Sequence, residues 1–316
     1  MKRALVRIAV IGSGPAGFYT AGHLLKDSEA PIEVDMFERL PTPHGLVRSG
    51  VAPDHPKIKS VTRVYEKTAA HPRFRFFGNV ELGSDIDHEE LAEHYHAIVY
   101  ATGAPADRPL GIPGEDLPGS APATDFVGWY NGHPDYRDHD FDLSCERAVV
   151  VGNGNVALDV ARMLTLSHSE LARTDIADHA LDLLEHSRIR EVHVVGRRGP
   201  AQAAFTNPEL LELGVLQDAE VVVDPAELER ALAVPDSFTD ATAERNVKVL
   251  REYAARTEGR AGAGARRRIV LRFLLSPVEL RPAADGRVGE VLCVRNALRA
   301  DADGRLAAVP TDEHET

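Results

Sequence analysis

The stretches RIAVIGSGPAG at 7–17 and RAVVVGNGNVA at 147–157 decide the fold of this chain. In each stretch, a run of apolar residues leads directly into a glycine-rich pattern, formed by Gly12, Gly14 and Gly17 in the first and by Gly152, Gly154 and Ala157 in the second. The first glycine permits a tight turn, the second lets the backbone approach a pyrophosphate, and the small third residue lets helix and strand pack closely. Two such units predict an α/β fold with two Rossmann-like, three-layer dinucleotide-binding domains.

The first stretch opens a predicted βαβ unit with a strand over 7–11, a helix over about 15–25 and a second strand over 32–37. Glu38 ends the second strand, 21 residues after Gly17. An acidic side chain at this position reaches the ribose hydroxyls of an adenine dinucleotide. Amide groups at the start of the helix point at the phosphates of the same ligand.

The second unit differs at the end of its second strand. A predicted helix follows Gly154, and on it Asp159 is expected to face solvent or to cap. The later strand over 191–195 runs into Gly196-Arg197-Arg198-Gly199, so arginines replace the acid of the first unit. Because a guanidinium group matches a phosphate bidentately, this unit is predicted to prefer NADP(H) over NAD(H). Two neighbouring dinucleotide sites indicate hydride transfer, and two Gly-rich turns without a ligand are the alternative.

Length and composition limit the classes of protein to which this chain can belong. A chain of 316 residues exceeds the usual size of one core, so two domains are expected. The net charge of −13 argues against nucleic acid as a partner. Only Cys145 and Cys293 are present, which excludes a redox dithiol, a cysteine-ligated iron–sulfur cluster and a structural zinc site. No stretch is apolar enough to insert into a membrane and no signal peptide precedes the first strand, so we expect a cytoplasmic protein.

The remaining segments suggest how the chain is organised. A strand over 97–100 meets the Pro/Gly-rich stretch 105–119, which is typical of a crossing between domains. The apolar segments 269–275 and 291–294 are interpreted as strands of an antiparallel excursion. Residues 261–268 are interpreted as a flexible turn between elements.

Four stretches together resemble the NADPH:ferredoxin oxidoreductases of the adrenodoxin reductase type (ferredoxin–NADP+ reductases). They are VIGSGPAGFYTAGHLL at 10–25, PTPHGLVRSGVAPDHPKIK at 41–59, VVGNGNVALDVARML at 150–164, and VVGRRGPAQAAFT at 194–206 followed by PEL. The GLVRSGVAPDH block is much more specific than a Rossmann pattern. The resemblance implies a flavoprotein that holds FAD, takes hydride from NADPH and passes single electrons to a ferredoxin-type iron–sulfur protein.

The resemblance also implies roles for single residues. Ala16 and Glu38 would hold the pyrophosphate and ribose ends of FAD, and Leu46 and Val80 would line its path. NADP(H) would be held by Arg108, by Gly152, Asn153, Gly154, Asn155 and Val156, and by Arg197 and Arg198.

His55 and Glu209 match a pair of the family that lies near the flavin and nicotinamide, where the two residues position the ring or relay protons. From the residues alone, His55 is a loop histidine beside Pro56. Glu209 is, on the same reasoning, an acid in the first helical turn after Pro208.

The family pattern divides the chain into residues 1–103 of an FAD domain, an inserted NADP domain over 104–302, and 303–316 as the start of a return to the FAD domain. In the family, the part of the chain that returns to the FAD domain carries a Gly-Trp dipeptide and a Gly-Pro-Thr-Gly segment. The given sequence stops at Thr316, about where that return should begin, and its single tryptophan, Trp129, lies elsewhere. The chain is therefore expected to be a shortened reductase.

Two other functions stay open at this point. One is an NADP(H)-binding module without flavin activity. The other is the flavin subunit of a larger NADPH-dependent complex, such as the small subunit of glutamate synthase, although that class carries cysteine-rich cluster ligands. A disulfide reductase is least favoured because the chain has no dithiol.

The arginine pair gives the first testable prediction. Replacing both residues (Arg197→Ala with Arg198→Ala) should raise the KM for NADPH far more than the KM for NADH, because only NADPH carries the phosphate that they read. Steady-state kinetics with both cofactors measures this. An equal loss for the two cofactors would show that the pair does not recognise the phosphate.

Overall fold

The structure is a computed structural model that describes residues 4–27, 31–104, 107–233, 240–259, 267–300 and 306–316. It divides into two compact units, one formed by 1–107 with 131–135 and the other by 108–130 with 136–316. The main division follows Asp107, close to the expected junction at 103/104. Among the described residues, no helix combines the length and the apolar character that crossing a membrane requires.

The first unit is built on a parallel sheet of four strands in the order β3-β2-β1-β4. The strands are β1 (Val6–Ile11), β2 (Ile32–Glu38), β3 (Phe74–Gly78) and β4 (Ala97–Tyr100). The helices are α1 (Pro15–Asp27), α2 (Leu46–Ser49), α3 (Pro56–Lys59), α4 (Thr62–Ala69) and α5 (His88–His94). The predicted strand–helix–strand order of this unit is confirmed, with boundaries that differ by one or two residues at some ends.

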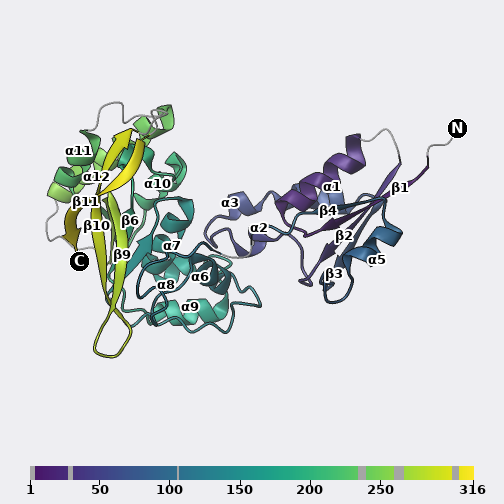
Figure 1. Cartoon of the computed structure of the whole chain (residues 1–316), viewed down its shortest axis with the longest axis horizontal. Coiled ribbons are helices and arrows are strands. Elements are labelled where there is room, and N and C mark those ends of the chain that lie inside the picture. Colours follow the sequence, from purple (N-terminus) through teal and green to yellow (C-terminus); the bar gives the residue numbers. More distant parts are fainter. Residues whose placement is uncertain (1–3, 28–30, 105–106, 234–239, 260–266, 301–305) are drawn as a thin grey trace. The chain divides into compact units, whose positions relative to one another are not determined.

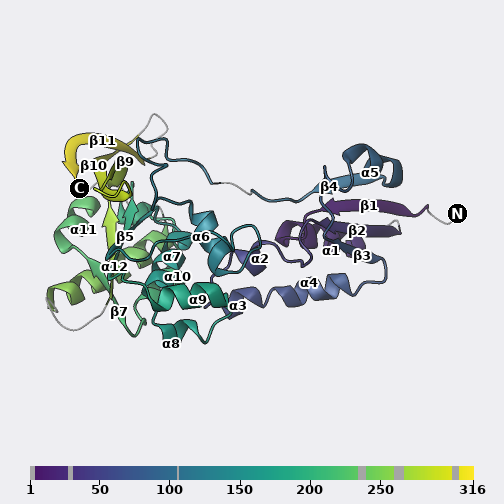
Figure 2. The ribbon, with the colours of Figure 1, turned by 90° about the horizontal axis from the view of Figure 1, so that it is seen from below.

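Alternation along β1 and β2 sends side chains to both faces of this sheet. Ile8 and Val10 pack with Phe18 of α1 and Tyr65 of α4 in one core cluster. Ala9 and Ile11 pack with Phe37 and Leu91 of α5 in another cluster. Figure 2 shows α4 and α5 on opposite sides of the strands. The unit thus has the three layers that the sequence predicts.

The second unit contains a parallel sheet in the order β5-β6-β8-β7. Its strands are β5 (Arg147–Val151), β6 (Glu191–Gly196), β7 (Ala219–Val223) and β8 (Arg267–Phe273). Its helices are α6 (Ala123–Tyr130), α7 (Asn155–Thr165), α8 (His168–Leu171), α9 (Asp178–Glu185), α10 (Asn207–Leu213), α11 (Pro225–Leu232), α12 (Ala241–Gly259) and the short 3-10 helix η1 (Pro200–Gln202).

The interpretation of 269–275 as antiparallel was wrong for 269–273, because β8 joins the parallel sheet between β6 and β7. Alternate residues Ile269, Leu271 and Phe273 are buried in the main core of this unit, and that burial favours a central strand. The predicted turn over 261–268 falls outside the described residues except for Arg267 and Arg268, which begin β8.

Three long strands form a separate antiparallel sheet in the second unit, β9 (Leu275–Pro282), β10 (Val288–Ala300) and β11 (Leu306–Glu315), in the order β11-β10-β9 (Figure 1). The segment 291–294 lies in β10, as expected. Residues 306–315 differ from the expectation of a return to the first domain, because they pair with β10. Glu315 strengthens this pairing, since its carboxylate accepts bonds of 2.6 Å from both Arg272 and Arg295.

Candidate dinucleotide-binding sites

The two glycine-rich turns are tied to their sheets by the same hydrogen bond. The Gly12 amide donates to the Phe37 carbonyl at 2.8 Å, and the Gly152 amide donates to the Val195 carbonyl at 2.8 Å. Both glycines have a positive φ, +99° and +124°, a backbone conformation that residues with a side chain rarely adopt. In each unit the turn is therefore held beside the end of the second strand, where the residue that reads the ribose is expected.

Some of the glycines are required by the fold itself. A Cβ on Gly12 would overlap the Ala101 carbonyl oxygen and lie 3.1 Å from the Cα of Thr102. A Cβ on Gly17 would overlap the Gly12 carbonyl oxygen, because α1 runs so close to the turn. These two positions need glycine whether or not a ligand binds.

The middle glycine of each pattern has no such internal reason. A Cβ on Gly14 would meet the Cα of Gly45 at 4.0 Å, and one on Gly154 would meet the Cβ of Ala204 at 3.9 Å, which are ordinary contacts. Gly154 also has an extended backbone, with φ −101° and ψ −179°, that any residue adopts. The space above both positions is open at the start of a helix, so these residues fit a bound pyrophosphate.

Glu38 is held in place at the end of β2, where the ribose of the first site is expected. Its Oε2 accepts hydrogen bonds from the Ser13 amide at 3.0 Å and the Ser13 hydroxyl at 2.7 Å, and its Oε1 accepts from the Leu40 amide at 3.1 Å. The carboxylate is thus linked to the glycine-rich turn through Ser13. The role of Ser13 was not foreseen, because its position within the pattern is unconstrained.

The loop from the GLVRSGVAPDH block lies against the same turn. The His44 amide donates to the Ser13 carbonyl at 3.0 Å, and a Cβ on Gly45 would lie only 2.8 Å from the Cα of Gly14. Burial lowers the pKa of His44, and the charge of Arg48 lowers it further, so the ring is neutral at pH 7. Leu46 follows with 70% of its surface exposed, free to contact a ligand.

The other first-unit residues are also placed. Val80 lies partly buried beside the second strand, and its amide donates to the Glu38 carbonyl at 2.9 Å. Ala16 lies exposed in the first turn of α1, where backbone amides lack helical partners. Gly12, Gly14, Ala16, Gly17, Glu38 and Val80 therefore gather around one strand–turn–helix junction.

The strand register shows what replaces Glu38 in the second unit. Ile11 pairs with Phe37, and Val151 pairs with Val195, so Gly196 stands where Glu38 stands and Arg197 where Arg39 stands. The acid of the first unit is thus absent from the second. A positive charge follows the strand in both units.

The two units differ in what balances that positive charge. Arg39 is bonded to Asp135 at 2.6 Å, and this hydrogen bond lowers the pKa of Asp135. In the part of the chain that the structure describes, the side chains of Arg197 and Arg198 have no hydrogen bond or ion pair. Two unbalanced guanidinium groups at this strand end are suited to an anionic ligand group such as a phosphate.

A hollow lies next to these arginines. It is lined by Arg198, by residues 201–206, and by Asp240, Thr242, Ala243 and Asn246 at the start of α12. The segment 204–206 is bonded to the second turn, since the Asn153 carbonyl accepts from the Ala204 and Phe205 amides at 3.0 and 3.1 Å. Asn155 adds a side-chain link, because its Oδ1 accepts from the Thr206 amide at 2.8 Å.

Val156 lies 52% exposed in the first turn of α7, beside the open space above Gly154. The structure thus brings Gly152, Asn153, Gly154, Asn155, Val156, Arg197 and Arg198 together. Arg108 is exposed, and among the described residues no hydrogen bond joins its side chain to this group.

Glu209 and His55 belong to different units. Glu209 lies in the first turn of α10 and accepts a hydrogen bond from Arg162 at 3.3 Å. His55 is the N-cap residue of α3, directly before Pro56.

Arg162 is a residue that the sequence analysis missed. Its side chain is 1% exposed, and it also donates to Asp159 at 3.0 Å and to Glu212 at 3.4 Å. Asp159 is therefore mostly buried and paired, so the prediction that it faces solvent or caps was wrong. An arginine between the apolar residues Ala161 and Met163 of α7 was the available signal, because a buried guanidinium requires acidic partners.

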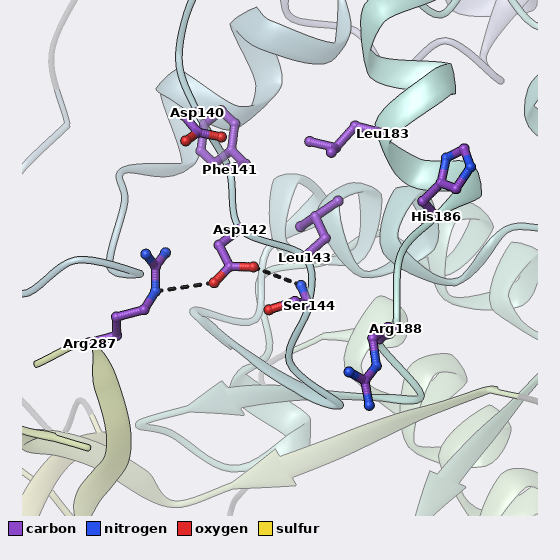
Figure 3. A pocket seen from close by; sticks show the side chains of 9 residues that line it. All are labelled: Asp140, Phe141, Asp142, Leu143, Ser144, Leu183, His186, Arg188 and Arg287. Atoms are coloured by element: carbon purple, nitrogen blue, oxygen red, sulfur yellow. Dashed lines mark hydrogen bonds and ion pairs between the residues drawn. The ribbon is translucent and has the colours of Figure 1, made fainter. Parts of the chain in front are cut away.

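A second hollow in this unit is shown in Figure 3. Arg287 is already paired there with Asp142 at 3.1 Å, and hydrogen bonds from Ser144 lower the pKa of Asp142. None of the predicted site residues lines this hollow. We therefore assign no cofactor to it.

Comparisons with known proteins agree with this geometry. Residues 6–199 match the family described as pyridine nucleotide-disulphide oxidoreductase. This chain belongs to that family, and two dinucleotide-binding Rossmann-like domains are its fold.

Individual relatives show which branch of this family the chain resembles. The chain is 54% identical to NADPH-ferredoxin reductase FprA of Mycobacterium leprae, over 98% of this chain and 67% of that protein. It is 45% identical to the mitochondrial NADPH:adrenodoxin oxidoreductase of Homo sapiens, over 98% of this chain and 63% of that protein. The structure of Mycobacterium tuberculosis FprA in complex with NADPH matches 99% of this chain and 68% of its own, with a TM-score of 0.91 at 52% identity. The resemblance to the adrenodoxin reductase type is thereby confirmed.

The open space above Gly154 generates a second prediction. Gly154→Ala should raise the Kd for NADP+ at least about tenfold, because the added methyl group would occupy the space of the pyrophosphate. The free energy of unfolding should change by no more than about 1 kcal/mol, since the backbone is extended there and only a helix N-cap changes. Isothermal titration calorimetry and urea unfolding measure the two effects.

Gly14→Ala is the matched control in the other unit. It should lower the FAD content of the purified protein while leaving the Kd for NADP+ unchanged. Wild-type affinity for NADP+ in the Gly154→Ala protein would contradict the assignment of this glycine.

Proposed function

We propose that the protein is an NADPH-ferredoxin reductase that holds FAD in its first unit and NADP(H) in its second. The observation that carries this proposal is the change of charge between two otherwise equivalent strand ends. Glu38 stands at the first, and Arg197 and Arg198, whose side chains have no ion pair among the residues that the structure describes, follow the second. One site therefore suits ribose hydroxyls and the other a phosphorylated ribose.

In the first unit, the chain's own groups would bind and orient FAD. Amides at the start of α1, at Ala16 and Gly17, would donate to the pyrophosphate, and Glu38 would accept from the ribose. Leu46 and Val80 would supply apolar contact along the length of the cofactor. When bound, FAD supplies the chemistry that accepts a hydride and releases electrons singly.

In the second unit, the backbone of Asn153, Gly154, Asn155 and Val156 at the start of α7 would bind the pyrophosphate of NADPH. Arg197 and Arg198 would pair with its 2′-phosphate, and Arg108 would add a further positive charge. This chain contributes orientation and electrostatic complementarity, so no nucleophilic side chain is required.

His55 and Glu209 are proposed to position the reacting rings or to hold a proton near them. Arg162 supports this role for Glu209, because its bond of 3.3 Å restricts the direction of the carboxylate. The wider organisation is part of the same proposal: an FAD domain over 1–103, an inserted NADP domain over 104–302, and a ferredoxin-type iron–sulfur protein as the electron acceptor in the cytoplasm.

The disulfide chemistry in the family's description is not part of the proposal. Both cysteines are free, with Cys145 exposed and Cys293 buried. Burial raises the pKa of both thiols, Cys145 and Cys293, which disfavours the reactive thiolate. The relatives' names likewise point to ferredoxin as the acceptor.

A spectrum tests the proposal directly. The purified protein should show visible flavin absorbance that bleaches when NADPH is added without oxygen, and a ferredoxin added afterwards should restore the bands. NADH at the same concentration is the control and should bleach them much more slowly. A colourless protein that still binds NADPH would contradict the reductase and favour the nucleotide-binding module.

A further inference from the structure

The turn 196–199, which carries Arg197 and Arg198, is held in place by residues that lie far away in the sequence. Gly196 lies under the side chain of Asn153, whose Cβ is 3.0 Å from the position that a Gly196 Cβ would take. Gly199, at the other end, would place a Cβ 3.3 Å from Leu298 of β10. The turn is thus packed between the glycine-rich turn at 152–154 of the same unit and the antiparallel sheet.

Asn296 of β10 holds the centre of the turn. Its side-chain Nδ2 donates to the Arg197 carbonyl at 2.9 Å and to the Ser276 hydroxyl at 2.8 Å. Both amide hydrogens are therefore used, and only 4% of the residue is exposed. The pairing of β10 with β11 shifts register between Val294 and Asn296, which marks an irregularity at this position.

A second contact fixes the next carbonyl. The Leu274 amide donates to the Arg198 carbonyl at 3.2 Å, and the Asn296 amide donates to the Leu274 carbonyl at 2.7 Å. Leu274 is buried and has φ +57°, a left-handed conformation that is strained for a leucine. Such strain persists only where the surrounding contacts enforce it, and it is common beside functional sites.

These contacts restrain the backbone of both arginines, while their guanidinium groups make no hydrogen bond or ion pair within the described part of the chain. A restrained backbone lowers the entropy that the arginines lose when they close on a phosphate, so it favours binding. We infer that Asn296 is a positioning residue that sets the preference of the second site for a phosphorylated ribose. This inference rests on the proposed function of that site.

The test uses two small probes and the full chain. Adenosine 2′,5′-bisphosphate carries the 2′-phosphate, and adenosine 5′-monophosphate lacks it. Asn296→Leu removes both donors and keeps the branching of the side chain, and it should raise the Kd of the bisphosphate by about 5- to 10-fold, as the loss of one charge-orienting hydrogen bond would. The Kd of the monophosphate should stay within about twofold.

Three further proteins sharpen the result. Ser276→Ala removes the other acceptor of Asn296 and should leave both Kd values unchanged. Asn296→Ala should repeat the selective loss without any added bulk. In the background of Arg197→Ala with Arg198→Ala, Asn296→Leu should cause no further selective loss, because its effect passes through those side chains.

Each outcome decides the inference. Equal weakening of both probes, or no change in either, would overturn it, since a merely structural role does not discriminate the 2′-phosphate. A selective loss that persists in the double-arginine background would also overturn it. If the wild-type protein showed no preference for the bisphosphate, the proposed function would fail together with the inference. If the wild-type protein preferred the bisphosphate and the Asn296→Leu protein kept the same preference, only the inference would fail.

Discussion

The hydrogen bond from the first glycine of each pattern to the carbonyl of the last residue but one of the neighbouring strand is the constraint on which both sites depend. It joins Gly12 to Phe37 and Gly152 to Val195, at 2.8 Å in each case. Since these glycines adopt a positive φ, the chain leaves the strand and opens a helix directly beside the end of the second strand. The backbone therefore places together the turn proposed to bind phosphate and the residue proposed to read the ribose.

The same backbone arrangement suits two different ligands because the side chains at the end of the second strand differ. In the first unit, Ser13 holds the Glu38 carboxylate against the turn, and Asp135 neutralises Arg39. In the second unit, Gly196 replaces the acid, and the structure shows no described partner for the two arginines that follow. Charge, rather than backbone geometry, distinguishes the two sites.

The elements of both sites could be predicted from the sequence because their signals are local. An apolar run, three small residues at fixed spacing and one charged position at a strand end all lie within a single stretch of chain, from Ile8 to Glu38 in the first unit and from Val149 to Arg198 in the second. The family resemblance added the residues in loops, such as Leu46 and Val80. Their position beside the first site follows from tertiary contacts that no periodicity shows.

The errors concern strand pairings and side-chain contacts that the order of residues does not show directly. The segment 269–273 was assigned the wrong sheet because a short apolar strand has the same alternation in parallel and antiparallel pairing. Asp159 was expected to face solvent or to cap because acidic side chains are rarely buried without a partner, and its partner Arg162 was not recognised. The pairing of β11 with β10 depends on Glu315 meeting Arg272 and Arg295, which lie 43 and 20 residues away along the chain.

A crystal structure of the protein with NADP+ tests the central claim most directly. The pyrophosphate should lie at the first turn of α7 above Gly154, and the 2′-phosphate should lie about 3 Å from guanidinium nitrogens of Arg197 and Arg198. A nucleotide bound elsewhere, or one whose 2′-phosphate faces solvent away from both arginines, would contradict the account.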